Sequence, residues 1–124
     1  QSNKEPADTA KLRADLSKNP EDVEKLRQLG EKFLDAGDPH TARLIFARAI
    51  QLGGGPTEQN LLGIASYQIG DRSSAFSAFS AAAKGGLEAA RQNLKKVLSQ
   101  SNLGAQADEV DKKIPQGKEG GRAL

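Results

Sequence analysis

The stretch GDPHTARLIFARAI, from Gly37 to Ile50, returns 33 residues later in altered form as GDRSSAFSAFSAAA, from Gly70 to Ala83. Five positions are the same in both copies: Gly37 and Gly70, Asp38 and Asp71, Ala42 and Ala75, Phe46 and Phe79, and Ala49 and Ala82. Further upstream, the pair Leu29-Gly30 returns as Leu62-Gly63 at the same spacing. A repeat of this length is typical of stacked helical hairpins, so the sequence predicts two such units in tandem.

Apolar residues recur at three- and four-residue steps on both sides of these stretches. This pattern predicts helices over residues 7–18, 20–36, 39–52, 56–69, 72–84 and 87–100. Asn19-Pro20 and Asp38-Pro39 are start signals, because the first side chain caps free backbone N–H groups and proline suits the first turn. Gly37 is predicted to stop the preceding helix by adopting a left-handed backbone.

A glycine inside a helix costs about 1 kcal/mol relative to alanine, so Gly30 and Gly63 need a structural reason. We expect the partner helix of each hairpin to cross at this glycine, closer than a side chain would allow. In the first unit Ala42 would be the small surface opposite Gly30, and Phe46 would fill the wedge that opens away from the contact. The second unit repeats the same residues.

These residues resemble the signature of the tetratricopeptide repeat (TPR) family, in which Leu-Gly is followed by an aromatic residue, Ala-x3-Phe and a late proline. The first unit matches at Leu29, Gly30, Phe33, Ala42 and Phe46, and the second at Leu62, Gly63, Ala75 and Phe79. The chain departs from the signature at the first aromatic, at the second aromatic of the second unit and at both late prolines, where it has Leu26, Gln59, Ser66, Gly54 and Leu87.

The resemblance implies an all-α fold: a short right-handed superhelical stack of antiparallel helical hairpins. The units would span about residues 21–53 and 56–86 within a helical domain over 7–101. Because about three repeats are needed for a stable stack, we interpret helices 7–18 and 87–100 as caps. Residues 1–6 are expected to be a flexible N-terminus. Residues 102–124 are expected to be weakly ordered or disordered, because PQGKEGGRAL has too little apolar surface to offset its ordering entropy.

Composition argues against several function classes. The chain of 124 residues has no Cys, and its net charge is only +2, without the clustered basic and aromatic residues of nucleic-acid binding. It has no apolar run of about 18 residues that would span a membrane. His40 is a lone histidine, whereas metal ligands come in sets, and GGGP lacks the Lys-Ser/Thr of a phosphate-binding loop. We therefore expect no enzymatic activity, no metal and no cofactor.

A binding surface remains as the predicted function. In the family that the chain resembles, the first helix of each hairpin lines a concave groove that holds a peptide or helix of a partner protein. By that resemblance the groove residues are Arg27, Glu31, Leu34, Asn60, Ile64, Tyr67, Gln68, Asn93 and Val97. Leu34, Ile64 and Tyr67 are predicted to be the apolar anchors, with the alternative that Tyr67 packs in the core.

One subtype of the family clamps a C-terminal carboxylate with Lys and Asn from successive repeats. The matching positions here hold Arg27, Glu31 and Leu61, so that clamp is not predicted.

A second function stays open beside partner binding. The chain would be a structural subunit that forms homo-oligomers or belongs to a larger assembly, with the groove filled by its own tail. Small bacterial envelope proteins of this family help to assemble pili or secretion systems. The absence of Cys fits a cytosolic and an exported protein equally.

Overall fold

Helices joined by short turns make up the protein, which is described over residues 5–124 by a computed structural model. These residues form seven α-helices and no β-strand: α1 (Ala10–Lys18), α2 (Val23–Asp35), α3 (Pro39–Gln51), α4 (Pro56–Ile69), α5 (Arg72–Lys84), α6 (Glu88–Gln100) and α7 (Gly104–Lys113). Residues 1–4, which include most of the predicted flexible N-terminus, lie outside the described residues. None of the helices within residues 5–124 combines the length and the hydrophobicity needed to cross a bilayer.

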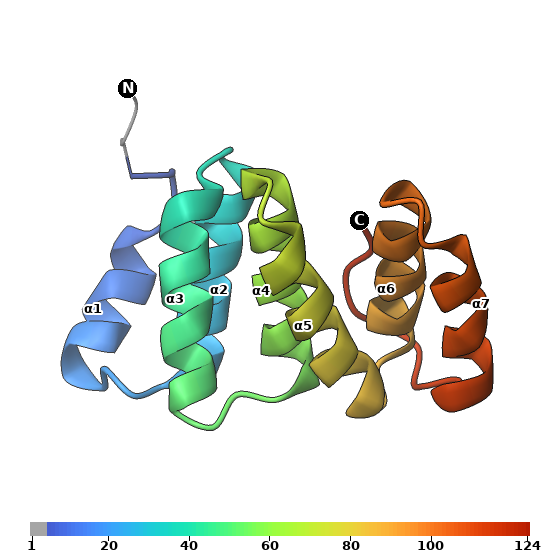
Figure 1. Cartoon of the computed structure of the whole chain (residues 1–124). Helices are drawn as coiled ribbons and strands as arrows, with labels where there is room; N and C mark the ends of the chain where they lie inside the picture. The colour runs from blue at the N-terminus through green and yellow to red at the C-terminus, as the bar shows by residue number, and fades with distance from the viewer. Residues whose placement is uncertain (1–4) are drawn as a thin grey trace.

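Each helix packs against the next one along the chain, and the result is an elongated stack of antiparallel helices (Figure 1). α2 pairs with α3 and α4 with α5, and α3 packs on α4 where the two hairpins meet. α1 covers the first hairpin at one end. The predicted all-α stack of helical hairpins is therefore confirmed.

Aspartate side chains begin three of the helices. Asp38 Oδ1 accepts a hydrogen bond from the Thr41 N–H at 3.1 Å, and Asp71 Oδ1 accepts one from the Ser74 N–H at 3.0 Å. α2 begins later than predicted, with Asp22 rather than Asn19 as its cap, because Asp22 accepts the Lys25 N–H at 3.1 Å. Asn19 instead terminates α1, where its N–H bonds to the Asp15 carbonyl.

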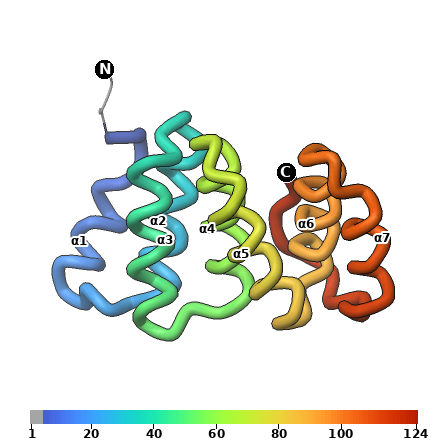
Figure 2. Tube along the Cα trace, viewed as in Figure 1, coloured from blue at the N-terminus to red at the C-terminus, as the bar shows by residue number. Residues whose placement is uncertain are grey.

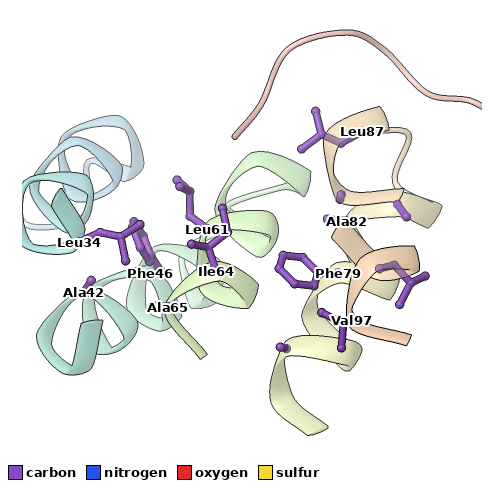
Figure 3. Packing of buried hydrophobic residues seen from close by; sticks show 14 of the residues in the cluster. Leu34, Ala42, Phe46, Leu61, Ile64, Ala65, Phe79, Ala82, Leu87 and Val97 are labelled. Atoms are coloured by element: carbon purple, nitrogen blue, oxygen red, sulfur yellow. The ribbon is translucent and has the colours of Figure 1, made fainter. Parts of the chain in front are cut away.

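The glycine of each Leu-Gly pair lies under a phenylalanine ring. A Cβ added to Gly30 would come within 2.4 Å of Phe46 Cε1, and one added to Gly63 within 2.5 Å of Phe79 Cε1. The prediction that Ala42 forms the surface opposite Gly30 is wrong in this detail, since the ring edge itself fills the notch that the missing side chain leaves. Both phenylalanines are fully buried, and Figure 3 shows them in the core.

The segment after α5 differs from the sequence-based expectation. Helix 87–100 was predicted to be a cap, and residues 102–124 to be weakly ordered. In the structure α6 and α7 form a third hairpin, because Ala107, Val110 and Ile114 are buried against α6. Arg91 Nη1 adds an ion pair to Asp111 Oδ1 at 2.6 Å, which joins the two helices.

Candidate functional site

The most distinctive surface of the molecule is formed by α2, α4 and α6, and we call it the groove face. Residues 115–124, here called the tail segment, leave α7 and turn back onto this surface. In Figure 2 the C-terminal end lies beside α6, on the side away from α7. The tail segment contacts side chains of α2, α4 and α6, so it crosses all three hairpins.

Two asparagines hold the main chain of the tail segment. Asn60 Nδ2 donates to the Arg122 carbonyl at 2.8 Å, and Asn93 Nδ2 donates to the same oxygen at 3.0 Å. The Asn93 side-chain oxygen accepts the Leu124 N–H at 2.9 Å, and the two asparagines bond to each other at 3.0 Å. Asn60 and Asn93 are only 1% and 2% exposed, so they are buried polar groups whose hydrogen bonds depend on an extended backbone at this place.

Side chains of the tail segment make two further contacts. The Arg122 guanidinium forms an ion pair with Asp35 Oδ1 at 2.6 Å, at the C-terminal end of α2. Leu124 is partly buried against the hydrophobic core. The tail segment therefore offers one cation and one aliphatic side chain, two residues apart, to separate places on the groove face.

The other end of the tail segment is fixed at the start of α6. The Lys118 N–H donates to the Gly86 carbonyl at 2.7 Å, and the Glu88 N–H donates to the Lys118 carbonyl at 3.0 Å. The Glu88 carboxylate accepts the Gly117 N–H at 2.9 Å and also binds Arg91. Hydrogen bonds from Arg91, Gln92 and the Gly117 N–H lower the pKa of Glu88 to about 2, so Glu88 is an anion at neutral pH.

Glycines fit the tail segment to this surface. A Cβ on Gly117 would lie 2.3 Å from the Gly86 carbonyl oxygen, which is backbone and cannot rotate away. Gly120 and Gly121 have φ angles of 99° and 89°, a conformation that other residues rarely adopt. Gly121 also lies against Leu87, where an added Cβ would be 3.1 Å from Cδ2. The fit of this polar segment therefore depends on residues without side chains.

Three of the predicted groove residues lie in the core instead. Leu34, Ile64 and Val97 are 2–3% exposed and belong to the hydrophobic cluster, which Figure 3 shows with these side chains labelled. The prediction that Leu34 and Ile64 are exposed anchors is therefore wrong. The physical reason is that neighbouring hairpins approach closely enough to cover both residues, leaving the polar positions on the groove face.

The other predicted groove residues have different surroundings. Arg27 and Glu31 form an ion pair at 2.6 Å and line a hollow together with Gly121 and Arg122. Tyr67 is half-buried against the core, and its hydroxyl donates to the side chain of Gln100. Gln68 is exposed. The structure thus brings Asn60, Asn93, Arg27 and Glu31 near the tail segment, and their role in binding a partner stays a prediction.

Sequence reasoning missed Asp35, Glu88 and the tail segment itself. One signal was present, because Arg27, Asn60 and Asn93 are spaced by 33 residues and therefore occupy the same place in successive hairpins. Tyr67 and Gln100 share another such register. Asp35 and Glu88 follow no repeat, and only the path of the tail segment gives them a role.

A second hollow lies on another part of the surface, between α5, α6 and α7. We call it the outer hollow. Its volume is about 540 Å³, and its apolar lining includes Phe76, Leu94, Val97, Leu98, Leu103, Val110 and Ile114. Phe76 and Leu103 are exposed by 42% and 40%, which is unusual for large apolar side chains.

The acidic residues of α7 have structural partners. Asp111 binds Lys95 at 2.9 Å and Arg91 at 2.6 Å, and these cations hold the pKa of Asp111 below its usual value. Among residues 5–124, no group of three or more His, Asp or Glu side chains is arranged to bind a metal ion.

Solved structures with a similar fold include two crystal structures of MamA. The first has a TM-score of 0.73 and 24% sequence identity and covers 80% of this chain and 60% of the MamA chain. The second has a TM-score of 0.72, again with 24% identity, and covers 80% of this chain and 56% of the other. The present chain therefore spans less than two thirds of the MamA chains. No family model and no curated protein matches it. The likeness shows a shared all-helical repeat fold.

Proposed function

We propose that the chain is a TPR-like protein-interaction scaffold whose groove face holds an extended segment of a partner protein. The observation that carries this proposal is the pair Asn60 and Asn93, which together bind one carbonyl and one N–H of an extended backbone. Main-chain hydrogen bonds recognise any extended segment, and side-chain contacts beside them provide the specificity. Stacked helical hairpins present this kind of surface in general.

The scaffold has no enzymatic role in this proposal. The groove face offers two amides, the Arg27–Glu31 pair, Asp35 and Glu88, and we assign all of them to binding. A carboxylate that works in acid–base catalysis near neutral pH needs a raised pKa. Glu88 has the opposite shift, because its hydrogen bonds stabilise the anion.

Site-specific photo-crosslinking tests the proposed function. A photoreactive residue replaces Thr57, which is exposed and lines the hollow that contains Gly121 and Arg122. The matched control places it at Leu44, which is 73% exposed on α3. We expect defined crosslinked proteins in the native host at position 57 that are absent at position 44, and fewer of them when Asn60 and Asn93 are both changed to Ala. Equal crosslinking at the two positions would contradict the proposal.

Self-assembly is a second candidate function, favoured by the outer hollow. Exposed apolar surface of this kind marks interaction sites on many proteins, and Phe76 and Leu103 lie at its edge. If a second copy covers this surface, sedimentation should show a concentration-dependent oligomer that Phe76→Ser converts to a monomer. A monomer at all concentrations would remove this candidate and leave the groove-face proposal untouched.

A further inference from the structure

The tail segment carries information about what the groove face binds and how binding is controlled. We propose that it is a built-in competitor, and that the partner's segment shares its chemistry: an extended stretch in which small residues precede an arginine, with an aliphatic residue two positions later. This inference rests on the proposed function, because it names the ligand and the regulation of the same site.

The first support is that the tail segment occupies the groove face as a ligand would. Its main chain satisfies both buried asparagines, Arg122 reaches Asp35 at 2.6 Å, and Leu124 packs on the core. The arginine and the leucine are the side chains that distinguish this segment from any other extended backbone on the surface. A partner segment that replaced the tail would satisfy the same groups only if it offered a cation to Asp35 and an apolar side chain at the place of Leu124.

The second support is that the tail segment can leave without disrupting the stack. Most of its side chains are exposed, including those of Gln116, Lys118, Glu119 and Ala123. After its departure Asn60 and Asn93 would face water, so their hydrogen-bonding groups would not be left unpaired in an apolar interior. The core residues that hold the hairpins together, such as Phe46 and Phe79, make no part of this contact.

The third support is the specific fit of Gly117. The tail segment needs glycine at this position, where the Gly86 carbonyl oxygen leaves no room for a side chain. It also needs Gly120 and Gly121 in their left-handed conformations. A segment without a binding role on this surface would not need such residues, whereas a segment that docks closely does.

A competition experiment on the full chain tests the inference. The probe is a fluorescein-labelled peptide GKEGGRAL, which has the sequence of residues 117–124. We compare its Kd for the unmodified chain with that for the variant Arg122→Ala/Leu124→Ala, in which only the tail is changed. If the tail occupies the groove face in nine of ten molecules, the apparent Kd of the unmodified chain is raised about tenfold. We therefore expect the tail variant to bind the peptide about tenfold more tightly.

A second way to release the tail guards against an effect of the two side chains alone. Gly117→Val blocks docking through the backbone, and we expect a similar gain in affinity with Arg122 and Leu124 present. In the tail variant, the further changes Asn60→Ala and Asn93→Ala should abolish the gain, while Leu44→Ala should not. Circular dichroism confirms that each variant keeps its helix content.

The outcomes separate this inference from the proposed function. Equal Kd values for the unmodified chain and both released variants would overturn the competitor. Equal binding of GKEGGRAL and the altered peptide GKEGGAAA would overturn the arginine and aliphatic specificity. If crosslinking at position 57 still captures partners in those cases, the proposed function stands and only this inference fails.

The same chemistry has a second source, which is the tail of another copy of the chain. Sedimentation distinguishes it, because exchange of tails between copies gives an oligomer that excess GKEGGRAL dissociates. A monomer that gains affinity on tail release places the competitor within one chain.

Discussion

A single pair of residues explains why the sequence repeats what it repeats. Gly30 under Phe46 and Gly63 under Phe79 are complementary shapes, because each ring fills the volume that a side chain would need. In the third hairpin the same register holds Lys96 and Lys112, so the glycine and the phenylalanine are lost together. Neither residue is useful without the other, and the repeat is therefore a repeat of one contact.

The contact predicts the effect of filling the notch. Gly63→Leu would push the ring of Phe79 out of its site, and overpacking of this kind lowers the free energy of unfolding by about 1–3 kcal/mol. Chemical denaturation measures the loss. The matched control is Gly104→Leu, at a helical glycine where an added Cβ meets nothing within 4 Å, and its effect should stay within about 0.5 kcal/mol. Similar losses in both variants would mean that Phe79 does not close the notch.

The helices differ in how well the sequence predicts them. α3, α4 and α5 were predicted almost to the residue, because proline, aspartate and glycine mark their ends and apolar residues follow the helical period. α7 was not predicted, since its buried residues Ala107, Val110 and Ile114 are few and lie among charges. Packing on α6 and the pair of Arg91 with Asp111 offset its ordering entropy. These contacts join distant residues, and no local pattern reveals them.

The attachment of α7 gives a prediction for this element. Asp111→Ala removes the partner of both Lys95 and the buried Arg91, and partly exposed charged hydrogen bonds of this kind contribute about 1 kcal/mol. We expect the amides of α7 to exchange hydrogen roughly fivefold faster, with α2 to α5 unchanged. Asp108→Ala changes an exposed carboxylate on the same helix and serves as the control. If Asp108→Ala has the same effect, Asp111 does not secure α7.

At the scale of the molecule, the sequence predicted the binding face but not the residues that make it. Stacking alone implies a surface of first helices, and Asn60 and Asn93 were correctly placed near it. Leu34 and Ile64 were misplaced because the repeat pattern gives the face of a helix but not how closely the next hairpin covers it. The tail segment was missed for a different reason. Its composition predicts disorder, and its order comes from hydrogen bonds to groups that only the folded stack brings together.

This dependence on the stack predicts how the molecule responds to pH. Glu88 joins α6 to the tail segment through the Gly117 N–H, and its pKa is about 2 in the folded chain. The ordinary value of 4.5 applies when the chain unfolds. Because the folded value is the lower one, the stabilisation is fully present above pH 4.5 and is lost progressively as the pH falls toward 2. Other acids with lowered pKa values, such as Asp71 and Asp111, add losses in the same direction.

Comparison with Glu88→Gln isolates the contribution of this residue. The amide cannot ionise, so the difference in unfolding free energy between the unmodified chain and Glu88→Gln should be largest near pH 6 and should shrink steadily below pH 4.5. Denaturation at a series of pH values measures this difference, and exchange of the Lys118 amide reports tail docking in the same samples. Glu109→Gln, at an exposed carboxylate of α7, is the control and should show a much flatter difference. A difference for Glu88→Gln that is constant with pH would mean that the carboxylate does not hold the tail segment through its charge, and that neutral hydrogen bonds alone fix the segment to the stack.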